Sequence, residues 1–318
     1  MTRLEKIIIT LPPIAFFIRK SKDITIPGFR GIPIFDVVIF FTQQVKKIGL
    51  NERAAAIAFN LIMALPALML FIFSIVPYFP EFFDLKVQIL YLFKDISPSS
   101  KTYGFIVGLL DDLMKQNVGV FSSGFILLLF YASNAMMAFI RTFDKSIQEN
   151  KAFFLHQRWR AIKLTTILIL LIISTTLIML GQEVLLTLVK KLFKFKQKTH
   201  LPWVNGLRWF IIVGLFFYGI AFIYRYAPSV KERWKLISPG SILATLLTLT
   251  TTVIFSYWVN HFAAYNKIYG SIGTVLIIML LIYINALILL IGFELNVSIT
   301  YLNQKAIDRK LLAQEIAE

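Results

Sequence analysis

Long apolar stretches separated by short polar segments dominate the chain from residue 54 onward. A helix needs about 20 apolar residues to cross the hydrocarbon core of a bilayer. Six stretches are long enough, so the pattern predicts an all-α, polytopic membrane protein with six transmembrane helices. The expected spans are residues 54–77, 120–140, 162–189, 207–224, 237–259 and 272–299.

A shorter apolar repeat precedes the first span, over residues 34–48. Its apolar residues recur at helical spacing, with polar residues on the opposite side. This pattern is typical of a helix that lies in the membrane interface. The apolar positions are Ile34, Val38, Phe41, Val45 and Ile48.

Two further amphipathic repeats, over residues 85–96 and 105–113, lie between the first two spans. Their helical spacing predicts amphipathic helices on the outer face of the membrane. No internal break divides the chain, so we expect one membrane domain over residues 35–300. A cytoplasmic arm (residues 1–34) and a cytoplasmic tail (residues 301–318) should flank it.

The composition narrows the possible chemistry. The formal net charge of +16 could suggest a nucleic-acid partner, but only 16% of the residues are charged and 58% are hydrophobic. Little soluble surface remains for a nucleic-acid-binding face. The chain has no cysteine, and its three histidines are isolated in sequence. We therefore expect no nucleic-acid partner, metal, cofactor or catalytic residue.

The basic residues predict the orientation of the chain. With both termini in the cytoplasm, the inner segments hold twice as many lysines and arginines as the outer segments, in agreement with the positive-inside rule. A lysine cluster after the third span breaks this rule locally. It could bind anionic lipid, or its lysines could simply reach the headgroups from the end of a span. The cluster is Lys190, Lys191, Lys194, Lys196 and Lys198.

Polar residues inside the spans are candidates for function because each one is costly in a bilayer. Arg53 and Asn60 share a face of the first span, and Asn134 and Arg141 share a face of the second at matching depths. Together with Glu294 and Asn296 near the cytoplasmic end of the sixth span, they predict a polar vestibule open to the cytoplasm. We expect Glu294 to be charged and to contact Arg53 or Arg141. Alternatively, the arginines anchor helix ends and the asparagines join helices by hydrogen bonds.

Five hydroxyl residues on the fifth span fall within about 80° of one helix face. Such a strip is either a seam along which helices pack closely or a hydrogen-bonding path that leads out of the vestibule. In both cases it should face the protein interior. The residues are Ser241, Thr245, Thr248, Thr252 and Ser256.

Several short motifs resemble those of the YihY/BrkB family of bacterial inner-membrane proteins, formerly described as ribonuclease BN. The sixth span carries Tyr-Gly-Ser-Ile-Gly at residues 269–273 and Gly-Phe-Glu-Leu-Asn at residues 292–296. Ser-Pro-Gly at residues 238–240 and Tyr-Arg-Tyr-Ala-Pro at residues 224–228 add to the likeness. The resemblance implies a six-helix fold and the bacterial inner membrane, and it leaves the activity open.

Three functions fit these observations. The placement of polar groups favours a transporter of a small anion, a metabolite or a lipid. A non-catalytic scaffold for envelope assembly would instead use the outer helices and the lysine cluster. A membrane enzyme, the former ribonuclease included, lacks the clustered carboxylates or paired histidine that such chemistry requires.

The orientation can be tested with reporter fusions. An enzyme that is active only outside the cytoplasm should be inactive when fused after Glu318 and active when inserted within residues 84–116. Activity after Glu318 would contradict the predicted topology.

Overall fold

The computed structural model describes residues 19–75, 107, 108, 111, 118–147, 154–192, 202–230, 233–261 and 264–317. Within these residues the regular structure is helical, with no strand. The long helices are α3 (Ile34–Ile48), α4 (Leu50–Ile75), α7 (Val118–Ile147), α8 (Phe154–Leu192), α9 (Pro202–Tyr226), α10 (Pro239–His261) and α11 (Ala264–Ala317).

These helices confirm the predicted all-α, polytopic membrane fold. Within the described residues α7, α9, α10 and α11 each contain a segment long and apolar enough to cross a membrane, and the bent pair α3–α4 makes a fifth if it counts as one span. Helix α8 coincides with the third predicted span, and the total of six spans stays a prediction. The predicted outer helices lie outside the described residues, except that residues 107, 108 and 111 are helical.

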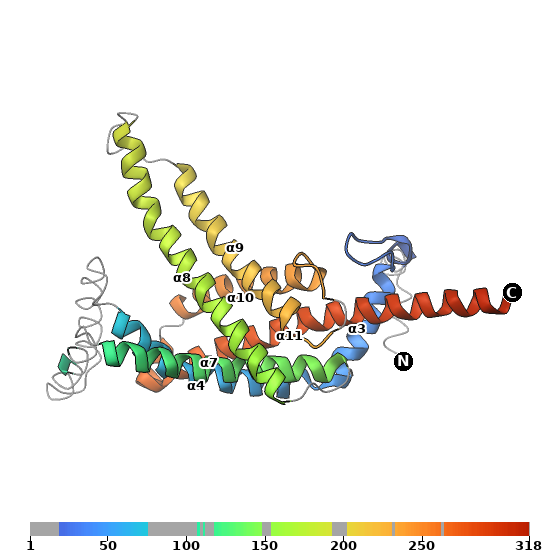
Figure 1. The fold of residues 1–318 in the computed structure, drawn as a ribbon, viewed down its shortest axis with the longest axis horizontal. Coiled ribbons are helices and arrows are strands. Elements are labelled where there is room, and N and C mark those ends of the chain that lie inside the picture. Colours follow the sequence, from blue (N-terminus) through green and yellow to red (C-terminus); the bar gives the residue numbers. More distant parts are fainter. Residues whose placement is uncertain are drawn as a thin grey trace.

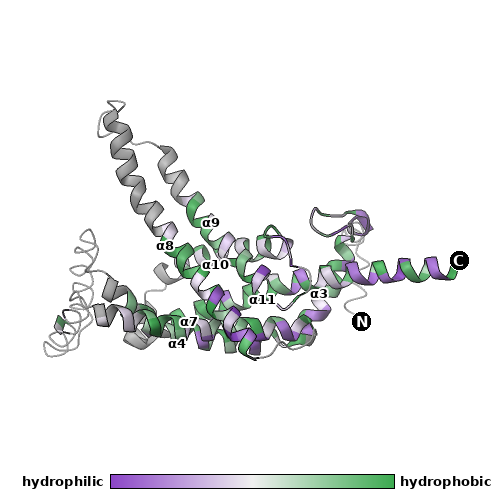
Figure 2. Ribbon diagram, viewed as in Figure 1, coloured by the Kyte–Doolittle hydropathy of each residue, from purple (hydrophilic) through white to green (hydrophobic). Residues whose placement is uncertain are grey.

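Helices α4, α7 and α11 form the centre of the protein. Helix α4 packs along α7, and α11 packs against α4 and α10, while α8 contacts α7 and pairs with α9. Helices α8 and α9 lean away from the other helices as a pair (Figure 1). The last turns of α11 project past the rest of the helices and end at the C-terminus (Figure 1). Hydrophilic residues gather around α3 and on this projecting part of α11 (Figure 2). We call this side of the molecule the α3 end.

A sharp corner joins α3 to α4. The helices meet at 68°, and Gly49 between them has a left-handed backbone (φ 67°) that a side chain would disfavour. The turn before α3 also packs on the protein, because Phe29 and Ile32 are buried against Val37 and Ile299. Part of the expected N-terminal arm is therefore attached to the membrane domain.

Helices α10 and α11 cross in direct backbone contact. A Cβ atom on Gly292 would lie 2.7 Å from the carbonyl oxygen of Gly240, and one on Gly240 would collide with the carbonyl oxygen of Gly292. Such close approach is typical of small residues at helix interfaces in membranes. The two glycines belong to the Ser-Pro-Gly and Gly-Phe-Glu-Leu-Asn motifs, so this contact joins two of the motifs on which the family resemblance rests.

An aromatic cluster forms the core beside this crossing. The rings of Phe143 and Phe293 stack with centroids 3.6 Å apart, and Tyr224 meets both edge-on with centroids 6.0 Å away. Trp234 lies 5.2 Å from Phe293 and donates a hydrogen bond to Thr300. The cluster holds α7, α9 and α11 together with the loop before α10.

The glycine contact can be tested with one substitution at two positions. Gly240→Ala should lower the free energy of unfolding in detergent by about 1–3 kcal/mol or more, because the added methyl group must push the backbones apart. Gly214→Ala is the matched control: nothing lies within 4 Å of its added Cβ, and alanine favours a helix by about 0.5–1 kcal/mol over glycine. Thermal unfolding that moves equally in both variants would contradict the close crossing.

Candidate functional site

A cavity of about 1150 Å³ lies at the α3 end; we call it the polar cavity. Its walls come from the turn before α3, from α3 itself and from the first turn of α4. The last turn of α7, the loop before α10 and residues 297–307 of α11 complete them. The volume is slightly above the usual range for small-molecule sites, which is about 300–1,000 Å³.

The polar cavity is positively charged. Arg30, Arg53 and Lys145 line it, and none of its described lining residues is acidic. Uncharged amides supply further hydrogen-bonding groups. They are Gln43, Gln44, Asn303 and Gln304. Guanidinium and ammonium groups beside neutral amides suit an anionic ligand such as a carboxylate, sulfate or phosphate.

Two hydrogen bonds connect the polar cavity to the buried carboxylate of Glu294. Arg53 Nη1 donates a 2.8 Å hydrogen bond to Ser146 Oγ, and Ser146 in turn donates a short hydrogen bond to Glu294 Oε1. Glu294 is 0% exposed, and its Oε2 has no hydrogen-bond partner among the described residues. The predicted link between Glu294 and Arg53 therefore exists, but it runs through a serine hydroxyl.

Asn296 fixes the start of α10 and does not line the cavity. Its Oδ1 accepts a 2.9 Å hydrogen bond from the Gly240 amide, and its Nδ2 donates to Ser238 Oγ at 3.0 Å. Ser238 Oγ also accepts a 3.2 Å hydrogen bond from the Ser241 amide in the same buried turn, so both the Gly240 and the Ser241 amides have partners. These bonds satisfy amides that a helix N-terminus leaves without partners.

Asp144 holds the loop that forms another wall of the cavity. Its carboxylate accepts hydrogen bonds from the backbone amide and the hydroxyl of Ser229, at 2.8 and 2.9 Å, and from Gln157 of α8 at 3.1 Å. The next residues along the loop, Val230 and Trp234, line the cavity. The anchor thus joins α7, α8 and the loop.

The remaining predicted vestibule residues point to other partners. Asn60 donates to the Ala56 carbonyl of its own helix, and Asn134 accepts a hydrogen bond from Arg158 of α8. The side chain of Arg141 is exposed. Of the six predicted vestibule residues, only Arg53 lines the cavity. The predicted vestibule around Asn60 and Asn134 is therefore wrong.

The hydroxyl strip of the fifth span is buried only in part. Ser241, Thr245 and Thr248 are buried, and Thr245 donates to the Ser241 carbonyl. Thr252 and Ser256 are exposed, so the strip does not face the interior along its whole length. None of the five residues lines the polar cavity. The buried part has the character of a packing seam beside the α10–α11 crossing.

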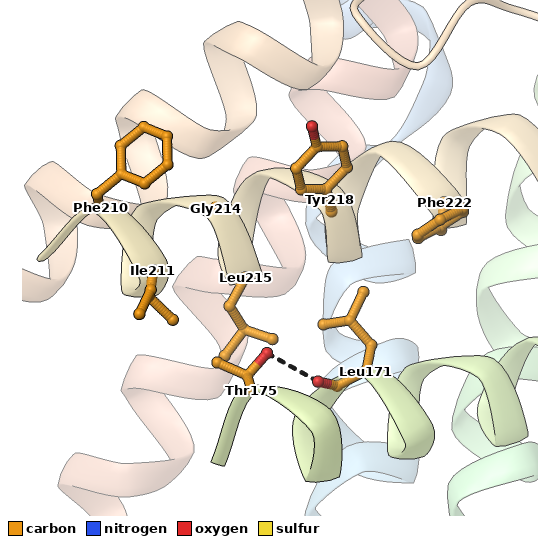
Figure 3. Close-up of a pocket in the computed structure, with 8 residues that line it drawn as sticks. All are labelled: Leu171, Thr175, Phe210, Ile211, Gly214, Leu215, Tyr218 and Phe222. Atoms are coloured by element: carbon orange, nitrogen blue, oxygen red, sulfur yellow. Dashed lines mark hydrogen bonds between the residues drawn. The ribbon is translucent and has the colours of Figure 1, made fainter. Parts of the chain in front are cut away.

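A second, smaller cavity of about 240 Å³ lies between α8 and α9. Its walls are mostly apolar, with two hydroxyl groups, on Thr175 and Tyr218 (Figure 3). The Thr175 hydroxyl donates to the Leu171 carbonyl of its own helix. The lysine cluster lies further along the chain. Lys190 and Lys191 fall in the last turn of α8, and Lys194, Lys196 and Lys198 lie outside the described residues.

Sequence reasoning missed the residues that complete the site. Ser146 and Asp144 carry no recognisable pattern, because a single hydroxyl or carboxylate near a helix end is usually solvated. For Ser238, its place in the Ser-Pro-Gly motif was the one signal in the sequence that could have identified it. Within the described residues no three histidine, cysteine, aspartate or glutamate side chains gather as a metal site would require.

The fold and site together define an all-α polytopic membrane protein with a basic cavity at one end of its helices. The sequence profile of the family described as "Virulence factor BrkB" matches residues 41–315. The chain belongs to this family, as its motifs indicated.

Three relatives match the chain over most of their own length. The chain is 25% identical to the "Putative ribonuclease-like protein YfkH" of Bacillus subtilis (strain 168), over 81% of this chain and 94% of that protein. It is 24% identical to "UPF0761 membrane protein MS0032" of Mannheimia succiniciproducens, over 83% and 88% of the two chains. A third relative, "UPF0761 membrane protein PSHAa0171" of Pseudoalteromonas translucida, is 23% identical over 79% and 81%. No solved structure matches the chain.

Two asparagines provide a test of this arrangement. Asn296→Ala should lower the free energy of unfolding by about 1–3 kcal/mol, because it leaves the buried Gly240 amide without its partner and removes one hydrogen bond to Ser238. Asn60→Ala should change it by less than about 0.5 kcal/mol, since the Asn60 amide bonds only to its own helix. Thermal unfolding in detergent measures both, and equal effects would contradict the assignment.

Proposed function

We propose that this protein is a bacterial inner-membrane transporter, not an enzyme, that moves a small anion, an anionic metabolite or an anionic lipid across the bilayer. The observation that supports the proposal is the polar cavity, where three basic side chains and four amides surround a space large enough for such a group. The anionic group would bind there first, before crossing the membrane.

The proposal places the α3 end in the cytoplasm. The segments that line the cavity belong to the predicted inner regions, which hold most of the basic residues. A basic cavity on that side attracts anions from solution, and it also lies near the headgroups because α3 presents Val38 and Ile39 outward. An anionic lipid headgroup and a free anion would therefore meet the same side chains.

A scaffold role is the second candidate, and one observation favours it. The projecting part of α11 exposes Ile307, Leu311, Leu312 and Ile316, which a partner protein could cover. The cavity favours transport over this alternative, because a scaffold has no need of a basic pocket. A catalytic role has less support, since the described lining residues include no acidic group beside a nucleophile.

Removing the cavity's charge tests the proposal. The double variant Arg30→Gln/Lys145→Gln should weaken anion binding and slow transport by at least about tenfold, because charge-assisted hydrogen bonds are each worth about 1.5–3 kcal/mol. The control is Arg309→Gln/Lys310→Gln, which removes the same charge from exposed positions outside the cavity.

Two assays on reconstituted vesicles distinguish the possible substrates. Jumps in phosphate, sulfate or citrate concentration on a supported membrane report movement of a free anion, and dithionite quenching of a fluorescent phosphatidylglycerol reports movement of a lipid. Movement in neither assay would contradict transport. Binding without movement would favour the scaffold.

A further inference from the structure

We propose that Glu294 couples the polar cavity to protons, so that an anion and a proton bind together. The inference rests on the proposed anion site and extends it to the coupling ion. Its basis is the chain of hydrogen bonds from Arg53, which lines the cavity, through Ser146, which also lines it, to the buried Glu294 carboxylate.

Glu294 has little to stabilise its negative charge besides this chain. The side chain is fully buried, one oxygen accepts from Ser146, and the other has no partner within the part of the chain that the structure describes. The charged group that acts on it electrostatically is Arg53. A buried carboxylate that loses its counter-charge becomes neutral by taking up a proton.

Among the described residues, Arg53 is the one basic group whose charge acts on Glu294. On α7, Lys145 faces the cavity and Asp144 is bonded to Ser229. On α9, the Tyr224 hydroxyl donates to the Leu289 carbonyl, and α10 has no acidic or basic residue before Tyr257. On α3, Asp36 and Lys46 are exposed.

These contacts define the coupled step. An anion in the polar cavity draws the Arg53 guanidinium toward itself and away from Ser146. Glu294 then gains one proton from the aqueous cavity by way of the Ser146 hydroxyl, and it returns that proton when the anion leaves. Because binding linkage is reciprocal, protonation of Glu294 must strengthen anion binding by the same factor.

Calorimetry on the full chain in lipid nanodiscs tests the coupling. The probe is naphthalene-1,3,6-trisulfonate, whose charge is constant over the pH range used. In imidazole and Tris buffers, which differ in ionisation enthalpy, the wild-type protein should take up as much as one proton per bound anion. Its affinity should rise as the pH falls, by no more than about tenfold per pH unit.

Glu294→Gln imitates the protonated carboxyl group. It should bind the probe more tightly than the wild type at pH 8, with no proton uptake and a flat pH profile. Asp36→Asn is the control: it removes one negative charge from the same end of the protein and should keep the wild-type slope. A wild-type slope in Glu294→Gln would overturn the proposal.

The wild-type measurement alone separates the two proposals, whether or not a variant folds. Probe binding without proton uptake would overturn the coupling and leave the anion site intact. Absence of probe binding to the wild type would overturn the anion site and the coupling together.

Discussion

The backbone contact between Gly240 of α10 and Gly292 of α11 sets the geometry of everything near the α3 end. Once Gly292 faces α10, Asn296 lies one turn further on the same face and reaches the first amides of α10. Glu294 is two residues from Gly292, which turns it by about 200° around the helix. It therefore points away from α10 and toward Ser146 of α7. A bulkier residue at either glycine would move both side chains.

The aromatic cluster beside the crossing also constrains function. Phe143, Phe293 and Tyr224 are all fully buried or nearly so, and they form a packed layer with Trp234, which lines the polar cavity and contacts Phe293. A polar solute could not pass through this packed layer as it stands. A transport cycle would therefore require the helices that carry these rings to separate, as in alternating access, and a continuously open channel does not fit this arrangement.

Much of the fold could be predicted from the sequence, because hydrophobic length and period determine which segments become helices. The interfacial repeat matched α3 at both ends. The site was harder to predict, because helical spacing says which residues share a face and says nothing of which helix that face meets. Asn60 and Asn134 had matching depths, yet one bonds to its own helix and the other to Arg158 of α8. The connection between Glu294 and Arg53 could be predicted only because a carboxylate inside a membrane needs a partner.

Ser146, which lies between Arg53 and Glu294, explains how Arg53 could move toward a ligand while Glu294 stays in place. A direct, bidentate contact between a guanidinium and a buried carboxylate is strong, and breaking it leaves an uncompensated charge. Here, among the described residues, Arg53 makes a single hydrogen bond to a neutral hydroxyl, so its remaining donors are available to a ligand in the cavity. Ser146 meanwhile keeps its hydrogen bond to Glu294. The carboxylate thus remains oriented while its counter-charge can be drawn away, which a direct ion pair would not allow.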